Sequence, residues 1–254
     1  MIGLATSPTR LSAMLIKSRA IVLHTFKYND TSSIAVLFTE ERGMVSFVVR
    51  LPKSHRSSRK PQLFHPLALL EVEWAPRDKV SLQSLRNVSL ATPYCNLPYD
   101  PAKASIAFFL SEFLYHSLRG ETANYPLFEY ITTSFLWLDT ALKGYANFHL
   151  VFLMRLSRFL GFYPNTDRAD SCPYFDLLNS CFTLAPPLHG HFIDSTEAQH
   201  LPTLLRMNYD TMHLFSFTRS QRNRLLDVMN SYYSLHIPDF PHLKSLDVLR
   251  DLFG

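Results

Sequence analysis

The stretch IAVLFTEERGMVSFVV, residues 34–49, decides the fold of the N-terminal part of this chain. It opens with an apolar run of five residues, and Val45, Phe47 and Val49 then recur at every second position. The polar residues 40–43 between the two runs end in a glycine, which can take the positive φ that a tight turn requires. The pattern therefore predicts a β-hairpin with a buried face.

Strand-like segments continue on both sides of this hairpin. We expect strands at Leu15–Phe26 and Leu67–Trp74 and a further one from Val80, with polar turns such as residues 27–32 and 76–78 between them. Five short strands without a strong helical period predict a small antiparallel barrel or sandwich.

The pattern becomes helical near residue 100. Asp100-Pro101 is typical of a helix start, because aspartate caps the first turn and proline is tolerated within it. Helices are predicted from there to Gly120, from Pro126 to Leu142 and from Phe148 to Leu160. Residues 167–194 are irregular and polar. Capping signals predict the starts of two more helices, one at Asp194 and one at Thr218, where Gln221 follows three residues later. A last helix is predicted to contain Leu246, Leu249 and Phe253. The fold class is α+β, with an all-helical second part.

Positive charge is concentrated near the predicted hairpin. Residues 42–70 contain no Asp or Glu but six basic residues: Arg42, Arg50, Lys53, Arg56, Arg59 and Lys60. Residues 1–82 carry twelve Lys or Arg and six Asp or Glu, whereas the remainder carries thirteen and fifteen. The N-terminal half is therefore expected to contact a polyanion, most commonly nucleic acid. The alternative is a solvated hairpin tip.

Other sequence features narrow the class of protein. The three cysteines fit a reducing compartment rather than a disulfide framework. The apolar run 148–162 contains two arginines and is too short to cross a bilayer, so we expect a cytoplasmic protein.

Residues 1–13 are interpreted as a disordered extension or an upstream start codon. Seven glycines, without a phosphate-binding glycine-rich loop, argue against a nucleotide enzyme.

Several motifs, in this order, resemble the RecO recombination-mediator family. They are residues 16–23, 37–40, 43–46 and 69–72 near the start, Tyr232–His236 and Leu243–Leu249 near the end, and Leu156–Pro164, which is similar to the segment before that family's zinc-binding region. The resemblance implies an OB-fold barrel over residues 14–95. It also implies a helical domain over residues 96–254, with a degenerate zinc region at about 167–194.

The resemblance further implies a non-enzymatic DNA-repair factor associated with the nucleoid. Such a protein binds single- and double-stranded DNA, anneals complementary strands and helps to load recombinase onto coated single strands. The implied partners are RecR and the acidic C-terminal tail of the single-stranded-DNA-binding protein. Two alternatives remain open: a general OB-fold adaptor for nucleic acid, RNA included, and a scaffold whose basic segment docks an acidic protein.

Candidate DNA contacts are the basic residues of the N-terminal part. Phosphate contacts are expected from Lys17, Arg19, Arg42, Arg50, Lys53, Arg56, Arg59 and Lys60. Base stacking could come from Phe26, Tyr28, His55 and Phe64, although any one aromatic residue is more often part of a core or turn.

The helical part is expected to bind the protein partners. An acidic tail that ends in an aromatic residue requires an apolar pocket beside a cation. The candidate cations are Arg119, Lys143, Arg155 and Arg158. Arg155 and Arg158 are three residues apart and would share a helix face, and the alternative is an internal ion pair with Asp139 or Glu129.

A metal site is the last hypothesis. Cys172, Cys181, His189 and His191 supply four nitrogen or sulfur atoms, whereas family members with zinc use two Cys-x-x-Cys pairs. Phe175 stands where the second thiol of the first pair would be, so no zinc is expected and apolar contacts of Phe175 and Phe182 replace it. His189, His191 and Asp194 could also hold a catalytic metal, but no second acidic group accompanies them, so no catalysis is expected.

Overall fold

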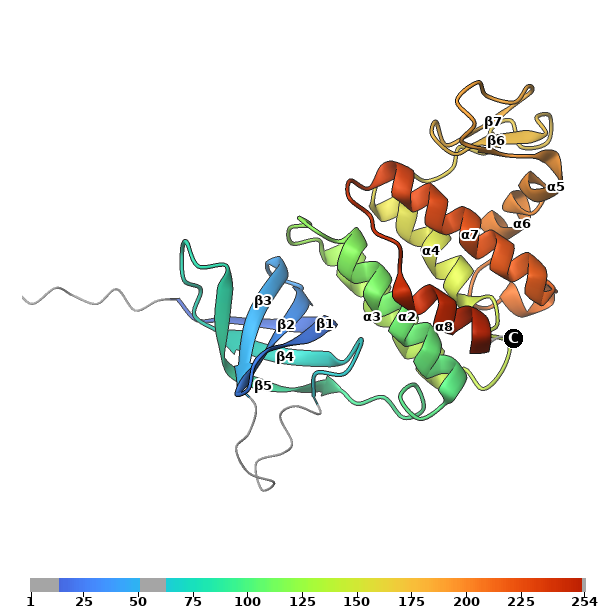
Figure 1. Ribbon diagram of the computed structural model, residues 1–254. Helices are drawn as coiled ribbons and strands as arrows, with labels where there is room; N and C mark the ends of the chain where they lie inside the picture. Colours follow the sequence, from blue (N-terminus) through green and yellow to red (C-terminus); the bar gives the residue numbers. More distant parts are fainter. Residues whose placement is uncertain (1–13, 51–62, 253–254) are drawn as a thin grey trace, which may run out of the picture.

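The computed structural model describes residues 14–50 and 63–252 of the chain, so the predicted extension 1–13 lies outside the described residues. Five strands, β1 (Ile16–Asn29), β2 (Ser32–Thr39), β3 (Gly43–Arg50), β4 (Leu69–Trp74) and β5 (Leu82–Thr92), form a closed barrel in the order β1-β2-β3-β5-β4 (Figure 1). All neighbours pair antiparallel except β3 and β5, which pair parallel from Ser46–Leu82 to Val48–Ser84. The predicted barrel is confirmed, and its order is that of an OB-fold.

Alternating side chains fill the barrel. Phe47 of β3 and Trp74 of β4 are fully buried there and meet edge to face, with ring centroids 5.4 Å apart. They pack with smaller residues such as Ala20, Val22 and Leu37, which β1 and β2 turn inward. The hairpin at residues 34–49 therefore supplies one wall of this core.

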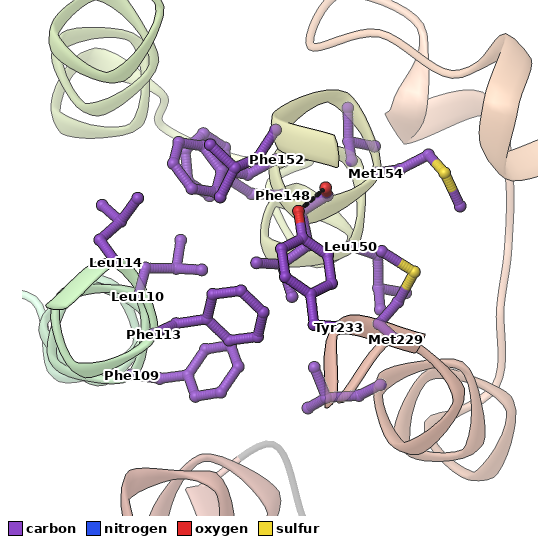
Figure 2. Packing of buried hydrophobic residues seen from close by; sticks show 14 of the residues in the cluster. Phe109, Leu110, Phe113, Leu114, Phe148, Leu150, Phe152, Met154, Met229 and Tyr233 are labelled. Carbon is purple, nitrogen blue, oxygen red and sulfur yellow. Dashed lines mark hydrogen bonds between the residues drawn. The ribbon is translucent and has the colours of Figure 1, made fainter. Parts of the chain in front are cut away.

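The helices build a second, larger core. It lies between α2 (Pro101–Ser117), α3 (Tyr125–Thr140), α4 (Phe148–Phe159), α7 (Arg219–His236) and α8 (Lys244–Leu252), with the short α5 (Ser195–Ala198), α6 (Leu201–Arg206) and η2 (Met212–Leu214) beside them. Figure 2 shows Phe109 and Phe113 of α2 facing Phe148 of α4 and Tyr233 of α7. The Tyr233 hydroxyl donates a hydrogen bond of 2.7 Å to the carbonyl of Leu153.

Helix starts agree with the predicted caps. Asp100 accepts hydrogen bonds from the backbone N–H groups of Ala102 and Lys103, and Asp194 caps α5 in the same way. Thr218 and Gln221 form a reciprocal capping box at the start of α7. The three predicted helix starts are therefore confirmed. A capping residue acts on backbone groups only two or three positions away, so the sequence alone can reveal it.

The segment predicted to be irregular contains a small sheet. Strands β6 (Tyr174–Asp176), β7 (Cys181–Thr183) and β8 (Phe192–Ile193) pair in the order β7-β6-β8. The second part of the chain is therefore not all-helical, which corrects the prediction. Strands of two or three residues are too short to produce a periodic pattern.

The barrel packs directly against the helices. Ile21, Leu23 and Phe38 point out of the barrel into the helical core, where Phe38 lies 6.1 Å from the ring of Phe128 on α3. The Ser111 hydroxyl of α2 donates a 2.5 Å hydrogen bond to the Leu23 carbonyl. In Figure 1, α2 and α3 accordingly lie between the barrel and the remaining helices.

Asp139 of α3 holds the connection between the two parts. Its carboxylate accepts hydrogen bonds from the backbone N–H groups of Cys95, Asn96 and Leu97, at 2.9, 2.7 and 2.6 Å. Burial raises the pKa of Asp139, but these three donors and the charge of Lys103 outweigh it and lower the pKa below its ordinary value. Within the described ranges, no helix is both long and apolar enough to span a bilayer.

Candidate nucleic-acid interface

A groove of about 510 Å³ lies where β3 and β5 separate after their short parallel pairing. Arg50 at the end of β3, Arg86 of β5 and Arg77 of the β4–β5 loop all line it, and all three are exposed. Its other lining residues are apolar or neutral, so no carboxylate faces the three guanidinium groups. We call it the arginine groove. Guanidinium groups without an internal anion are suited to phosphate.

Gln83 fixes the loop that carries Arg77. Its buried side-chain amide accepts a hydrogen bond of 2.9 Å from the Arg77 backbone N–H. The same amide donates to the carbonyls of Arg77 and Val80, at 3.1 and 2.6 Å. The Arg77 backbone is therefore held on the barrel core, and its position at the groove does not depend on a ligand.

The predicted basic segment is attached at this groove. Arg50 is the last described residue before it, Phe64 follows closely after it, and both line the arginine groove. Lys53, Arg56, Arg59 and Lys60, together with His55, lie outside the described residues. Their roles stay predictions, but their attachment points are at the groove.

Lys17 and Arg19 lie elsewhere, on the outer face of β1. They line a hollow that also contains Glu40, Glu71 and Glu73. Arg19 donates two hydrogen bonds to Glu40, at 3.0 and 2.7 Å, and a third to Glu129 of α3. The hydrogen bonds from Arg19 outweigh burial and lower the pKa of Glu40. The structure therefore places Arg19 in the contact between barrel and helices.

The other N-terminal candidates are dispersed. Arg42 is exposed in the β2–β3 turn, at the opposite end of the eight-residue β3 from Arg50 and thus roughly 25 Å away. Phe26 and Tyr28 near the end of β1 are 41% and 56% exposed, which leaves them available for stacking. Phe64 is 6% exposed and packs in the barrel core, so its side chain is chiefly structural.

The four candidate partner cations do not form one cluster. Arg119 follows the end of α2, with its guanidinium 5.3 Å from the Tyr115 ring, and Lys143 is exposed in the α3–α4 connection. Both other candidates belong to α4. Arg155 donates to the carbonyl of Met207 and lies over Tyr209, whereas Arg158 lies 4.5 Å from the Tyr163 ring. The alternative ion pairs are wrong, because Asp139 binds backbone amides and Glu129 binds Arg19.

Two of the side chains that were candidates for metal binding are engaged in other contacts. His189 Nε2 lies 3.2 Å from a carboxylate oxygen of Asp176, and Asp194 caps α5. Phe175 and Phe182 pack edge to face at 5.0 Å in the small sheet. In the parts of the chain that the structure describes, no three His, Cys, Asp or Glu side chains are grouped to hold a metal ion.

Sequence reasoning missed Arg77 and Arg86. Arg77 stands beside Asp78, so the local net charge gave no signal. Arg86 lies in a strand where the apolar residues Leu82, Leu85 and Val88 recur at every third position, so no alternation with a period of two marks the face that Arg86 occupies. Their approach to Arg50 depends on the parallel pairing of β3 with β5, which no local pattern reveals.

Comparison with known proteins agrees with this architecture. The family model Recombination protein O N terminal matches residues 14–94, and Recombination protein O C terminal matches residues 98–247. The chain is similar to proteins named DNA repair protein RecO. The protein from Phocaeicola vulgatus is 53% identical, and the match covers 95% of this chain and the full length of the relative. The protein from Bacteroides fragilis is also 53% identical, and that match covers 94% of this chain and the full length of the relative. The one from Flavobacterium psychrophilum is 34% identical over 95% and all of the relative. On these matches, the chain belongs to the Recombination protein O family.

Proposed function

We propose that this protein is a DNA-repair and recombination mediator that binds single- and double-stranded DNA through its barrel. The arginine groove carries this proposal, since Arg50, Arg77 and Arg86 converge there without a carboxylate. The names of the relatives, DNA repair protein RecO, support the same process. The barrel, at residues 14–95, is the DNA-binding unit, and residues 96–254 form the partner-binding unit.

The mechanism requires no covalent chemistry. Cations that neutralise phosphates release the counterions condensed on DNA, and this release drives binding in low salt. Two neutralised strands that are held close together repel each other less, so complementary strands can anneal. The protein then acts as a non-catalytic mediator, close to the nucleoid in the cytoplasm, and helps to load recombinase onto coated single strands.

The proposed partners are RecR and the acidic C-terminal tail of the single-stranded-DNA-binding protein. Exposed cations in the helical part support the second of these. Arg119, Lys143 and Arg158 are exposed, whereas Arg155 is partly buried and bound to Met207. The three exposed residues are therefore the first to test with a labelled tail peptide.

The experiment measures affinity for single-stranded DNA across a salt series. A triple variant in which alanine replaces Arg50, Arg77 and Arg86 should bind with a weaker salt dependence. The magnitude of the slope of log affinity against log salt should fall by about 2, since each lost phosphate contact removes about 0.7. The matched control replaces three exposed arginines outside the groove, Arg168, Arg206 and Arg219, and should keep the slope. An unchanged slope in the groove variant would refute the proposal.

A second variant tests the basic segment separately. Charge reversal of Arg56, Arg59 and Lys60 should weaken binding and flatten the salt dependence. Parallel measurements with double-stranded DNA, RNA and an acidic peptide separate the mediator from a general nucleic-acid adaptor and from a protein scaffold. Annealing of complementary strands in the same samples distinguishes mediation from simple binding.

A further inference from the structure

A row of aromatic rings runs along the outer face of β1 and onto α2. The ring of His24 lies 5.7 Å from that of Phe26 on the same strand and 4.7 Å from that of Tyr115 on α2, nearly parallel to the latter. The Arg119 guanidinium lies over the Tyr115 ring, 5.3 Å from its centroid. We call His24, Phe26 and Tyr115 the aromatic row. Its outer end is open, because Phe26 is 41% exposed.

A cleft of about 400 Å³ lies beside the row, between β1, α2 and the start of α8. Its walls include His24, Thr25, Phe64, Phe108 and Lys244. Phe108 is 51% exposed although it belongs to a helix whose neighbouring residues form the core. The volume lies in the range of pockets that hold a small planar ligand.

The polar groups of the cleft favour a neutral ligand. Glu112 accepts hydrogen bonds from the backbone N–H groups of Lys244 and Ser245, so its carboxylate is held at the wall of the cleft, which Lys244 also lines. An acidic peptide would meet the Glu112 carboxylate. A planar ligand without net charge would meet aromatic rings and the hydroxyl groups of Thr25 and Ser111.

His24 adds a donor and an acceptor. Burial lowers its pKa, against the opposing charge of Glu112, so the imidazole is neutral near pH 7. A neutral imidazole has one N–H donor and one nitrogen acceptor. Neither ring nitrogen has a hydrogen-bond partner in the described part of the chain. Nucleobase edges carry both donors and acceptors, which matches this pair.

The cleft and the arginine groove share a wall. Phe64 lines both, and its carbonyl accepts a hydrogen bond of 3.3 Å from Thr25 in the cleft. The cleft and the arginine groove therefore adjoin each other at Phe64. We propose that the cleft and the aromatic row bind an unpaired base of single-stranded DNA by stacking, while the arginine groove holds the phosphates.

This inference rests on the proposed DNA binding, and it assigns a separate role to a separate surface. The groove binds phosphates and so accepts any DNA, whereas the row requires a base that is free of its partner. Single strands therefore gain contacts that a duplex cannot make.

The experiment compares an oligothymidylate with an abasic strand that has the same number of phosphates. The wild-type protein should bind the oligothymidylate roughly tenfold more tightly, since stacking on aromatic side chains favours binding by about that factor per base. Phe26→Ala and His24→Ala should remove most of this ratio and leave the salt slope unchanged. Phe26→Tyr, which keeps a ring, should preserve the ratio. So should Tyr99→Ala, which removes a 79%-exposed ring outside the row.

The outcomes separate this inference from the proposed function. A ratio that is the same in wild type, Phe26→Ala and His24→Ala would overturn the stacking site and leave the groove intact. A second outcome would also overturn the stacking site. In it, an acidic peptide ending in an aromatic residue displaces oligothymidylate from the wild type but not from Phe26→Ala, while Phe26→Ala still prefers the oligothymidylate to the abasic strand. A wild-type protein that binds neither strand would overturn both. Because Phe26 lies at the surface, loss of folding is checked by comparing the melting temperature with that of Tyr99→Ala.

Discussion

Gly43, the first residue of β3 after the β2–β3 turn, lies directly against the backbone carbonyl of Glu121, in the connection between α2 and α3. A side-chain carbon on Gly43 would stand 2.2 Å from that oxygen. The next residue, Met44, donates its backbone N–H to the same carbonyl at 3.3 Å. Gly43 also has a φ of 67°, a conformation that favours glycine. The turn residue of the hairpin is thus also a contact between barrel and helices.

Replacement of Gly43 with alanine should therefore destabilise the protein by more than about 3 kcal/mol, from backbone strain and from the clash together. The matched control is Gly120→Ala, at a φ of 82° with no atom within 4 Å of the new carbon, where strain alone costs about 1 kcal/mol. Urea unfolding measures both free energies. Equal losses would show that the contact with Glu121 contributes nothing.

Asp139→Asn should weaken the connection between barrel and helices. The folded pKa of Asp139 is below its unfolded value, so its contribution to stability is fully present above about pH 4 and is lost as the pH falls through the folded pKa. The variant should be less stable than wild type at neutral pH and should lose less stability on acidification. Asp210→Asn, at an exposed aspartate, is the control and should follow the wild-type curve. Parallel curves for wild type and Asp139→Asn would contradict this account.

Arg19→Ala should act on stability more than on DNA affinity. The variant loses the hydrogen bonds to Glu40 and Glu129, and because the Arg19 side chain is 40% exposed we expect a loss of about 1 kcal/mol that shrinks in high salt. Its effect on DNA binding should be smaller than that of Arg50→Ala, because two carboxylates already engage its charge. A larger loss of affinity for Arg19→Ala would place DNA on the β1–β4 face instead.

Gln83→Leu tests how Arg77 is positioned. It removes three hydrogen bonds to the β4–β5 loop without changing any charge. DNA affinity should fall severalfold, and the loss should not add to that of Arg77→Ala, because the glutamine acts through that arginine. Additive losses in the double variant would show that Gln83 supports binding by another route.

The small sheet should be stable without metal. Chelator treatment should leave the melting temperature unchanged, whereas Phe175→Ala should cost about 3–5 kcal/mol, because a fully buried ring leaves a cavity. Cys95→Ser, at an exposed thiol outside the sheet, serves as the control. A melting temperature that falls on chelation would mean that a cation occupies this region.

Local signals in the sequence account for much of the fold. The hairpin at residues 34–49 and the caps at Asp100 and Thr218 were predictable, because turn and capping chemistry acts within a few residues. The parallel pairing of Ser46 with Leu82 was not, since it joins segments that no short pattern connects. The same limit explains the site. Arg50 stood out by composition, whereas Arg77 and Arg86 gained a role only when the barrel brought them beside it.

The parallel pairing of β3 with β5 has a consequence for the newly synthesised chain. A contact between strands so far apart in sequence forms slowly, after the local hairpins. Until the barrel closes, Arg50 and Arg86 belong to separate pieces of an open sheet, and the groove between them does not exist. An unfinished chain therefore carries the same arginines without the groove that we propose for DNA. The DNA binding that we propose for this groove is thus restricted to molecules that have completed folding.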